Sequence, residues 1–359
     1  MTTWRYIAQR AVTKEWLHWD VPLTLDDLSW ALSGPGSLRG TVTPDVGQLR
    51  GADGLPLFDE WGTFLFAEAD GEIRWGGIII RSHFTGPDWQ IEAAGFSAYP
   101  HGLPYGGAVS TTSIDPADAI REIWRYVQEN EDGDLGVVID PTTTPIRLGK
   151  PGEPYAINWW EATDCGGEID ALARETPIDY AEEHYWDGEE IAHRLRLGYP
   201  RLGRRRDDLA FEQGVNVVEV VEVDRDGGEF ANAIHALGSG EGRKAVVTDI
   251  AERDGRLRRT FVYTDKSVTT RERLTAFARA ELAARRNVAE IASVEVVNHP
   301  HAPIGSWALG DDVLIRASLP WLGDVAIWHR ITGWSLVSDD RAVLDLRRSD
   351  AFTYGGAVA

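Results

Sequence analysis

The chain has 359 residues, 43% of them hydrophobic, and its 15 Trp, 10 Tyr and 10 Phe are spread along its length. This length exceeds the ~250–300 residues at which one hydrophobic core stops growing, and the composition excludes global disorder, so we expect two or more domains. The formal net charge is −21, because 36 basic residues face 57 acidic ones, and this balance disfavours tight binding to nucleic acids or anionic membranes.

Membrane insertion and disulfide chemistry are not indicated either. No apolar run approaches the ~20 residues of a membrane span, and the opening segment is charged where a signal peptide is apolar. We therefore expect a soluble protein without a membrane span. Cys165 is the only cysteine, which excludes an intrachain disulfide, a Cys-pair metal site and a redox dithiol.

A β-rich region is predicted over residues 20–100. Apolar runs flank Asp70-Gly71, a strong hairpin-turn pair. Expected strands lie at 38–43, 61–69, 73–80 and 89–95.

Two features mark the limits of this pattern. Leu25, Leu28 and Leu32 have helix-like spacing, but Gly34-Pro35-Gly36 ends it at once, so we expect only a short segment there. A Pro/Gly cluster at 99–107 predicts a domain boundary near residue 104.

An added α+β domain is predicted over residues 105–210. Asp115 followed by Pro116 is an N-cap with proline at the first helical position, and apolar residues then recur at helical spacing as far as Val127. A shorter helix is expected over 168–175, before Pro177. The remaining expected extended segments lie at 136–140, 146–148 and 193–197.

The third region, residues 211–359, again predicts strands. We expect a strand over 215–223 and hairpin turns at Asp226-Gly227-Gly228 and Asp254-Gly255. Thr269 and Glu272 fit a capping box, which predicts an inserted helix over 269–287. Later strands are expected at 293–298, 312–317, 326–334 and 342–346.

The first and third regions share a rhythm. Residues 75–94 and 325–346 each read as an apolar strand, a tight turn and a second strand, after a strand and a glycine-bearing turn. The identity between them is poor, so a duplicated domain and a coincidence among β hairpins both stay open.

One concentrated basic stretch, Tyr199–Asp208, lies in this acidic chain. A guanidinium fork matches both phosphates and carboxylates. The neighbouring Asp207 and Asp208 and the overall charge favour ion pairs, within the chain or between subunits, over nucleic-acid binding. The candidate subunit-contact residues are Arg201, Arg204, Arg205 and Arg206.

The candidate motifs for phosphate and metal binding are weak. Gly238–Lys244 resembles a phosphate loop, but a strand is expected after it instead of a helix, which favours a hairpin loop. His299 and His301 flank Pro300, where an extended loop is more natural than a chelate, even with His235 and His329 in reach. We expect no metal and no cofactor.

Catalytic motifs are equally weak. Several carboxylates near Trp186 offer a glycosidase-like pair, but proximity means little in a chain with 57 acids. No serine motif and no histidine base for Cys165 supports nucleophilic catalysis. We therefore expect no enzyme activity. The residues considered are Glu182, Glu183, Asp187, Glu189 and Glu190 for acid catalysis, and Ser97, Ser110, Ser113 and Cys165 as nucleophiles.

Several phrases together resemble a known family. They are Thr3–Tyr6, Leu32–Gly40, the helix after Asp115-Pro116, Tyr155–Leu172 and Leu197–Leu209. With these phrases the chain resembles the minor tail proteins of long-tailed actinobacterial phages, which are similar to the central baseplate hub proteins of tailed phages.

The resemblance implies a fold and an assembly. The fold class would be α+β, mainly β, with two related tube-type β-barrel domains at 1–104 and 211–359 and the added α+β domain at 105–210. Three subunits would form a tail-tip ring that continues the tail tube, with the tube or distal tail protein, the tape measure protein and fibre or tip proteins as partners. Such a protein would be made in the host cytoplasm and carried in the virion. Some hub proteins carry a fused lysin domain, which we expect to be absent because the last strand lies close to Ala359.

Two classes of function follow. The favoured one is a structural tail-tip hub through which DNA passes without specific binding, with an acidic channel face and the arginines in subunit contacts. The alternative is a Trp-rich carbohydrate-active enzyme or glycan-binding module that acts on the host cell wall.

Overall fold

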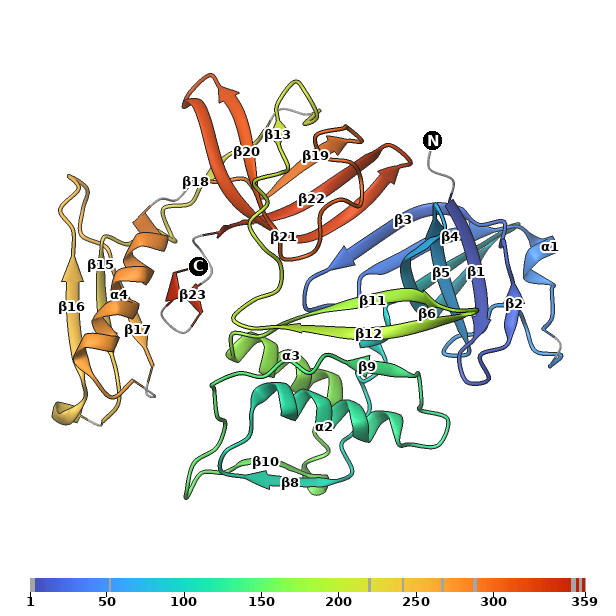
Figure 1. Cartoon of the computed structure of the whole chain (residues 1–359), viewed down its shortest axis with the longest axis horizontal. Coiled ribbons are helices and arrows are strands. Elements are labelled where there is room, and N and C mark those ends of the chain that lie inside the picture. Colours follow the sequence, from blue (N-terminus) through green and yellow to red (C-terminus); the bar gives the residue numbers. More distant parts are fainter. Residues whose placement is uncertain are drawn as a thin grey trace. The chain divides into compact units, whose positions relative to one another are not determined.

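The computed structural model describes residues 4–51, 53–218, 221–240, 242–265, 268–286, 289–349, 353–354 and 357–358. The chain divides into two compact units (Figure 1). The first unit contains residues 1–203, 304–310 and 332–343, and the second contains 204–303, 311–331 and 344–359. Strands predominate over helices, which confirms the α+β, mainly β class.

An antiparallel sheet forms much of the first unit. Its strand order is β3-β4-β7-β6-β5-β1-β2, and the end of β21 pairs with β3. The short helix α1 (Pro44–Gly47) follows β4. The strands are β1 (Trp4–Arg10), β2 (Trp16–His18), β3 (Thr24–Ala31), β4 (Ser37–Val42), β5 (Thr63–Ala69), β6 (Glu72–Thr85), β7 (Asp88–Ala94) and β21 (Gly323–Ser338).

The predicted hairpin of β5 and β6 is confirmed. Asp70 and Gly71 join the strands with φ of 54° and 82°. A two-residue turn with positive φ at both positions is type I′, whose twist matches that of the strands. The register places Phe64 opposite Ile78, so two large apolar side chains meet across the pair.

Residues 24–31 form a strand despite the helix-like leucine spacing. A register irregularity between Leu25 and Asp27 shifts the alternation of this strand. The bulge explains why the leucine spacing does not follow the period of two typical of strands. The Leu28 side chain of this strand is fully buried.

Helices α2 (Pro116–Gln128) and α3 (Cys165–Glu175) confirm the two predicted helices of the middle region. The Asp115 carboxylate accepts hydrogen bonds from the Ala117 N–H at 2.9 Å and from the Thr144 N–H at 2.6 Å. The predicted N-cap therefore also ties a distant loop to the helix. The other elements here are η1 (Phe96–Ala98), β8 (Ala108–Thr111), β9 (Val137–Ile139), β10 (Tyr155–Asn158), η2 (Trp159–Glu161), β11 (Asp179–Asp187) and β12 (Glu190–Gly198).

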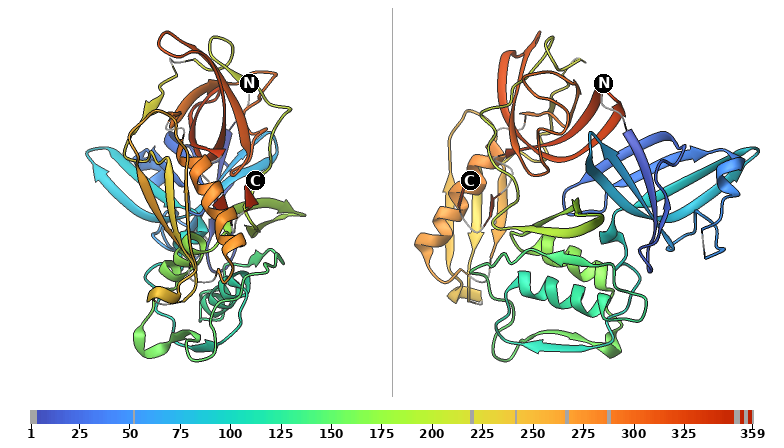
Figure 2. Two further views of the ribbon diagram at one scale, coloured as in Figure 1. Left: turned by 90° about the vertical axis from the view of Figure 1, so that its left-hand side faces the viewer. Right: turned by 45° about the vertical axis from the view of Figure 1, so that its right-hand side comes forward.

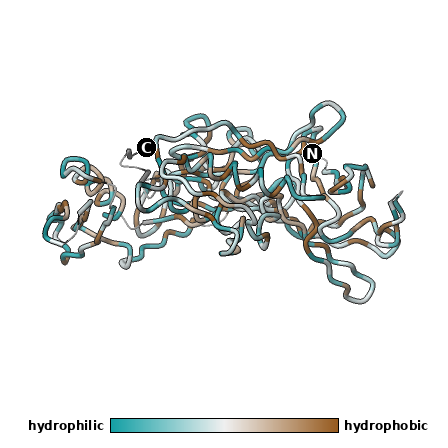
Figure 3. Tube along the Cα trace, turned by 90° about the horizontal axis from the view of Figure 1, so that it is seen from below, coloured by the Kyte–Doolittle hydropathy of each residue, from teal (hydrophilic) through white to brown (hydrophobic). Residues whose placement is uncertain are grey.

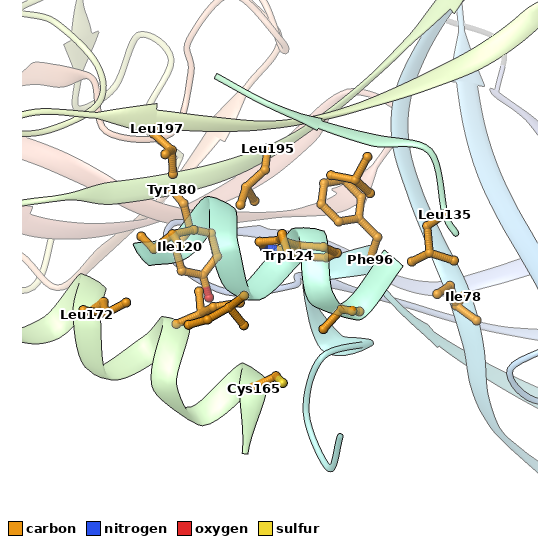
Figure 4. Close-up of a cluster of buried hydrophobic side chains, with 14 of the residues drawn as sticks. Ile78, Phe96, Ile120, Trp124, Leu135, Cys165, Leu172, Tyr180, Leu195 and Leu197 are labelled. Atoms are coloured by element: carbon orange, nitrogen blue, oxygen red, sulfur yellow. The ribbon is translucent and has the colours of Figure 1, made fainter. Parts of the chain in front are cut away.

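One hydrophobic core runs through the first unit (Figure 4). It joins Phe64 and Ile78 of the sheet to Trp124 of α2 and Leu195 of β12. Tyr105, inside the Pro/Gly cluster at 99–107, belongs to the same core. The chain composition changes near residue 104, but the packed interior continues across it.

The second unit contains another antiparallel meander. Strand β20 (Asp312–Leu319) pairs with β21, which pairs with β22 (Arg341–Arg348); β13 (Phe211–Glu212) and β19 (Ser293–Val297) join its edges. Strands β21 and β22 also have residues in the first unit. Among the described strands, the large sheet is an open path, with no pairing that closes it into a barrel.

The two meanders have similar proportions. In β5–β7 a strand of 14 residues lies between two of 7, and in β20–β22 a strand of 16 residues lies between two of 8. A duplicated domain requires such a likeness, so the predicted duplication stays open.

Helix α4 (Arg271–Arg286) packs on its own three-stranded sheet, as Figure 2 shows. Strand β15 (Ala233–Leu237) lies between β16 (Val247–Ala251) and β17 (Thr260–Thr264). Leu274, Phe277 and Leu282 of the helix share a core with Ile234. The remaining short elements are β14 (Asp224–Arg225), η3 (Gly242–Lys244), β18 (Ala289–Glu290), β23 (Thr353–Tyr354) and β24 (Ala357–Val358).

The strand predicted over 215–223 is wrong. The Asn216 side chain accepts a hydrogen bond from the Glu212 N–H at 2.8 Å and donates to the Ala210 carbonyl at 2.7 Å. These bonds hold a tight turn directly after β13, since an asparagine side chain competes with ladder pairing. Residues 219 and 220 lie outside the described residues.

Both predicted hairpin turns of this region are also wrong. The chain passes through Asp254-Gly255 from β16 to β17, which lie on opposite sides of β15. Asp226-Gly227-Gly228 follows β14, whose partner is the distant β18. Turn residues mark the bends here, whereas long-range pairing decides which strands meet.

The inserted helix begins two residues later than predicted. The Thr270 hydroxyl accepts a hydrogen bond from the Arg273 N–H at 3.4 Å, so Thr270 is the N-cap in place of Thr269. The end predicted at Asn287 lies outside the described residues.

Strand β5 is buried at every position, whereas β22 alternates between buried and less buried positions, as one-sided burial of a sheet requires. Figure 3 colours the chain by hydropathy and shows hydrophilic and hydrophobic segments distributed along it. No helix among the described residues has both the length and the apolar character needed to cross a membrane.

Candidate functional site

The basic stretch lies partly inside the protein. The Arg206 side chain is 10% exposed, and its guanidinium donates to Asp311 at 2.9 Å and to Asp208 at 2.7 Å. Its pKa is raised, with the hydrogen bond to Asp208 as the largest cause. This arginine therefore serves an ion-pair network within the chain, one of the two roles that the sequence left open.

The neighbouring arginines are differently placed. Arg204 and Arg205 are exposed. The Arg205 guanidinium lies over the Trp328 ring at 3.8 Å and its Nε pairs with Asp207 at 3.1 Å. Arg201 is half-buried. Subunit contact by these residues stays a prediction, and Arg204 and Arg205 are the two that present most surface to a partner.

Replacing Arg206 tests the buried network. Arg206→Met should lower the free energy of unfolding by about 3–5 kcal/mol, because it removes a cation that pairs with the buried Asp311 carboxylate. Arg205→Met is the matched neighbour and should cost less than about 1 kcal/mol, since its ion pair with Asp207 is exposed. Urea denaturation of both variants measures the difference, and equal losses would contradict a buried network at Arg206.

The carboxylates considered for acid catalysis have separate roles. The Glu182 carboxyl accepts hydrogen bonds from the backbone N–H groups of Phe96 at 3.1 Å and Ser97 at 2.8 Å. Glu183 pairs with Arg194 at 3.4 Å. Two of the five therefore hold the fold together. The remaining three lie exposed at or beside the tip of the β11–β12 hairpin: Asp187, Glu189 and Glu190.

The candidate nucleophile and metal ligands also have structural environments. Burial raises the pKa of the Cys165 thiol to about 11, so the reactive thiolate is disfavoured. His329 is buried and its Nε2 accepts a hydrogen bond from the Ile291 N–H at 3.1 Å. His299 and His301 lie with ring centroids 4.7 Å apart. Among the described residues, no three His, Cys, Asp or Glu side chains gather as a metal site requires.

A buried titratable cluster was not predicted. His184 and His193 lie opposite each other on β11 and β12, with their Nδ1 atoms 2.9 Å apart. Loss of solvation lowers the pKa of His184 to about 3 and that of His193 to about 2. The same cause raises the pKa of Glu182 to about 8. Tyr180, Glu182 and His184 alternate on one strand face, which is the sequence signal for this cluster.

A tryptophan-lined cavity of about 540 Å³ lies in the first unit. The rings of Trp30 and Trp334 stack with centroids 3.7 Å apart and planes 4° apart. The Trp30 Nε1 donates to the Arg74 carbonyl at 2.8 Å. The other principal residues that line the cavity are Trp4, Trp186, Trp307, Glu72, Glu183 and Arg196.

A second group of indoles, which shares Trp186 with the cavity, gathers where the loop after β2 meets the β11–β12 hairpin. Trp19 stacks on Trp16 with ring centroids 4.5 Å apart, and Trp186 lies 5.9 Å from Trp16 and 6.4 Å from Trp19. Trp19 is 47% exposed. We call these three side chains the tryptophan surface.

Further tryptophans are exposed on loops. Trp321, in the loop between β20 and β21, is 94% exposed, and Trp159 and Trp160 in η2 are 61% and 63% exposed. Large exposed aromatic side chains are typical of surfaces that contact another molecule.

The fold is that of solved phage tail proteins. The 43 kDa tail protein of prophage MuSo2 from Shewanella oneidensis matches with a TM-score of 0.58 and 14% identity, over 97% of this chain and 99% of that one. The prophage tail protein gp18 from Listeria monocytogenes matches with a TM-score of 0.56 and 11% identity, over 96% and 95%. The tail protein from Neisseria meningitidis gives 0.56 and 12%, over 95% and 96%.

No protein-family model matches the sequence, and no curated protein matches it. The similarity therefore lies in the fold, which covers nearly the full length of the three tail proteins.

Proposed function

We propose that this chain is a structural protein of a phage tail, the hub at the tail tip. The observation that carries the proposal is the shared fold over 95–97% of the chain with three tail proteins. A match of this extent includes both units, together with helix α4 and its three-stranded sheet. It is therefore more specific than a shared β domain. On this proposal the protein is a virion component, made in the host cytoplasm, and not an enzyme.

The proposed assembly is a homotrimeric ring. The two meanders of similar proportions, β5–β7 and β20–β22, support two related tube-type β domains in each subunit. Three subunits with two domains each supply six similar units, which fits a six-fold tube without a symmetry clash. The proposed neighbours are the tube or distal tail protein, the tape measure protein, and fibre or tip proteins.

The proposed ring lets DNA pass without binding it. A net charge of −21 per chain supports an acidic channel wall, because a basic wall would hold phosphates by counterion release. Specific DNA binding is therefore not part of the function.

Mass and shape in solution test the proposal. Light scattering after size exclusion should give a particle of three times 39.8 kDa, and electron microscopy should show a ring with a central channel. A protein that stays monomeric up to ~100 μM and joins no ring with tail-tube protein would contradict it.

The alternative function, glycan binding or cleavage, is favoured by the tryptophan-lined cavity of about 540 Å³. Indole faces beside charged side chains suit sugar rings. Release of soluble sugars from purified cell walls by the protein would support this alternative and contradict the proposed absence of enzyme activity.

A further inference from the structure

We propose that Arg204 and Arg205 of one copy dock on the tryptophan surface of a second copy. This inference rests on the proposed trimer and adds the residues that join its subunits. The two sites are on different units of the same chain: the arginines on the second and Trp16, Trp19 and Trp186 on the first. A contact between unlike surfaces is heterologous, which is the type that closes rings.

Charge is the first reason for this pairing. Each copy carries −21, so copies repel one another unless oppositely charged surfaces meet at the contact. A second segment, 253–259, carries four arginines within seven residues, whereas the basic stretch at 201–206 carries four within six. Within it, Arg206 is bound to Asp208 and Asp311 inside its own unit, which leaves Arg204 and Arg205 as the exposed pair.

The backbone holds these two arginines in place. The Arg204 N–H donates to the Asp311 carboxylate at 3.0 Å. The backbone of Arg205 forms an isolated β-bridge with Asp312 at the start of β20. Arg205 is further fixed by Trp328 at 3.8 Å. Its ion pair with Asp207 is exposed, so exchange for a partner's carboxylate costs little. Pre-ordered side chains lose less entropy when they bind.

The tryptophan surface offers the matching chemistry. Indole faces attract guanidinium groups, and arginine and tryptophan are among the residue types enriched at the centres of interfaces. Five carboxylates lie within four sequence positions of these indoles, and among the described residues none has a basic group within 4.0 Å: Glu15, Asp20, Asp187, Glu189 and Glu190. The segments that carry the indoles therefore also carry negative charge that no ion pair among the described residues neutralises.

A charge-swap experiment tests the contact. The variant Arg204→Glu/Arg205→Glu should raise the concentration for half-dissociation of the trimer about tenfold or more, because two attractive contacts become repulsive. The variant Asp187→Lys/Glu189→Lys/Glu190→Lys should weaken the trimer as well. The two sets combined in one chain should regain most of the lost affinity, since opposite charges then meet again. Circular dichroism melting shows whether each variant folds.

The matched control is Arg253→Glu/Arg258→Glu, which makes the same charge change on exposed residues of the second unit. It should leave the trimer within about twofold of the wild type. Trp19→Ser, which changes no charge, should also weaken the trimer, because it removes the exposed indole of the docking surface.

The outcomes separate the two proposals. A wild-type protein that stays monomeric and joins no ring with tail-tube protein overturns the proposed function. A wild-type trimer that responds equally to the arginine variant and the control, or a charge swap that restores nothing, overturns this inference alone. Loss with Arg204→Glu/Arg205→Glu together with recovery in the swapped chain supports it.

Discussion

Trp124→Ala should lower the free energy of unfolding by about 3–5 kcal/mol, the range measured when large aromatic residues are truncated in a packed core. The Trp124 side chain is fully buried on α2, and its ring meets Phe96 edge to face with centroids 5.7 Å apart. Its contacts join the helix to the sheet residues Phe64 and Ile78 in one core. Removal of the indole therefore leaves a cavity at the point where both parts of the first unit meet.

The matched control for this change is Trp159→Ala. Trp159 is 61% exposed in η2, so its removal should change the stability by less than about 0.5 kcal/mol. Urea denaturation followed by circular dichroism compares the two variants. A loss below about 1 kcal/mol at Trp124 would contradict a shared core across residue 104 and would favour two separately packed domains.

Local chemistry explains what the sequence predicted well. Asp70-Gly71 requires positive φ at both positions, and Asp115-Pro116 combines a cap with a fixed φ, so each feature acts within a few residues of itself. The structure confirms both the hairpin and the helix, although β6 continues to Thr85, five residues beyond its predicted end.

Long-range pairing explains most of what was missed. Strand β1 lies between β5 and β2. It carries Gln9 and Arg10, polar residue types that are usually exposed to solvent. The structure buries Arg10 because Asp53, 43 residues away, pairs with it at 2.8 Å. No local sequence pattern identifies Asp53 as the partner of Arg10.

The same limit applies to the candidate site. Sequence reasoning identified the arginine stretch and its neighbour Asp208, but the second partner of Arg206, Asp311, lies 105 residues away. Likewise, the tryptophan surface brings together Trp19 and Trp186, which are 167 positions apart in the chain (186 − 19 = 167). Composition showed that tryptophan is abundant, and only the fold shows which indoles share a surface.

Acidification should destabilise the first unit, and the His184–His193 pair is a principal cause. Burial keeps both rings neutral, with pKa values of about 3 and 2 in the folded state, against about 6.5 in an unfolded chain. As the pH falls below about 6.5, the two histidines bind protons in the unfolded chain but stay unprotonated in the folded chain. The stability from these groups is therefore complete above pH 6.5 and is lost as the pH falls toward 3, by up to about 1.4 kcal/mol per pH unit for each ring.

Glu182 has the opposite dependence. Its folded pKa is raised to about 8, so the folded chain keeps a proton that the unfolded chain loses near pH 4.5. Its contribution is complete below pH 4.5 and is lost as the pH rises to 8. The histidine effect therefore requires a variant of one ring and cannot be read from the wild type alone.

His193→Phe isolates the histidine effect, because the new ring lies among Phe64, Phe66 and Phe96 and takes up no proton. Between pH 6 and pH 4 the variant should lose stability less steeply than the wild type, by up to about 1.4 kcal/mol per pH unit. His83→Phe, the same change at an exposed position on β6, is the matched control. Urea denaturation at half-unit pH steps measures the three slopes. If His193→Phe and the wild type lose stability in parallel over this range, the buried pair does not control the acid sensitivity of the fold.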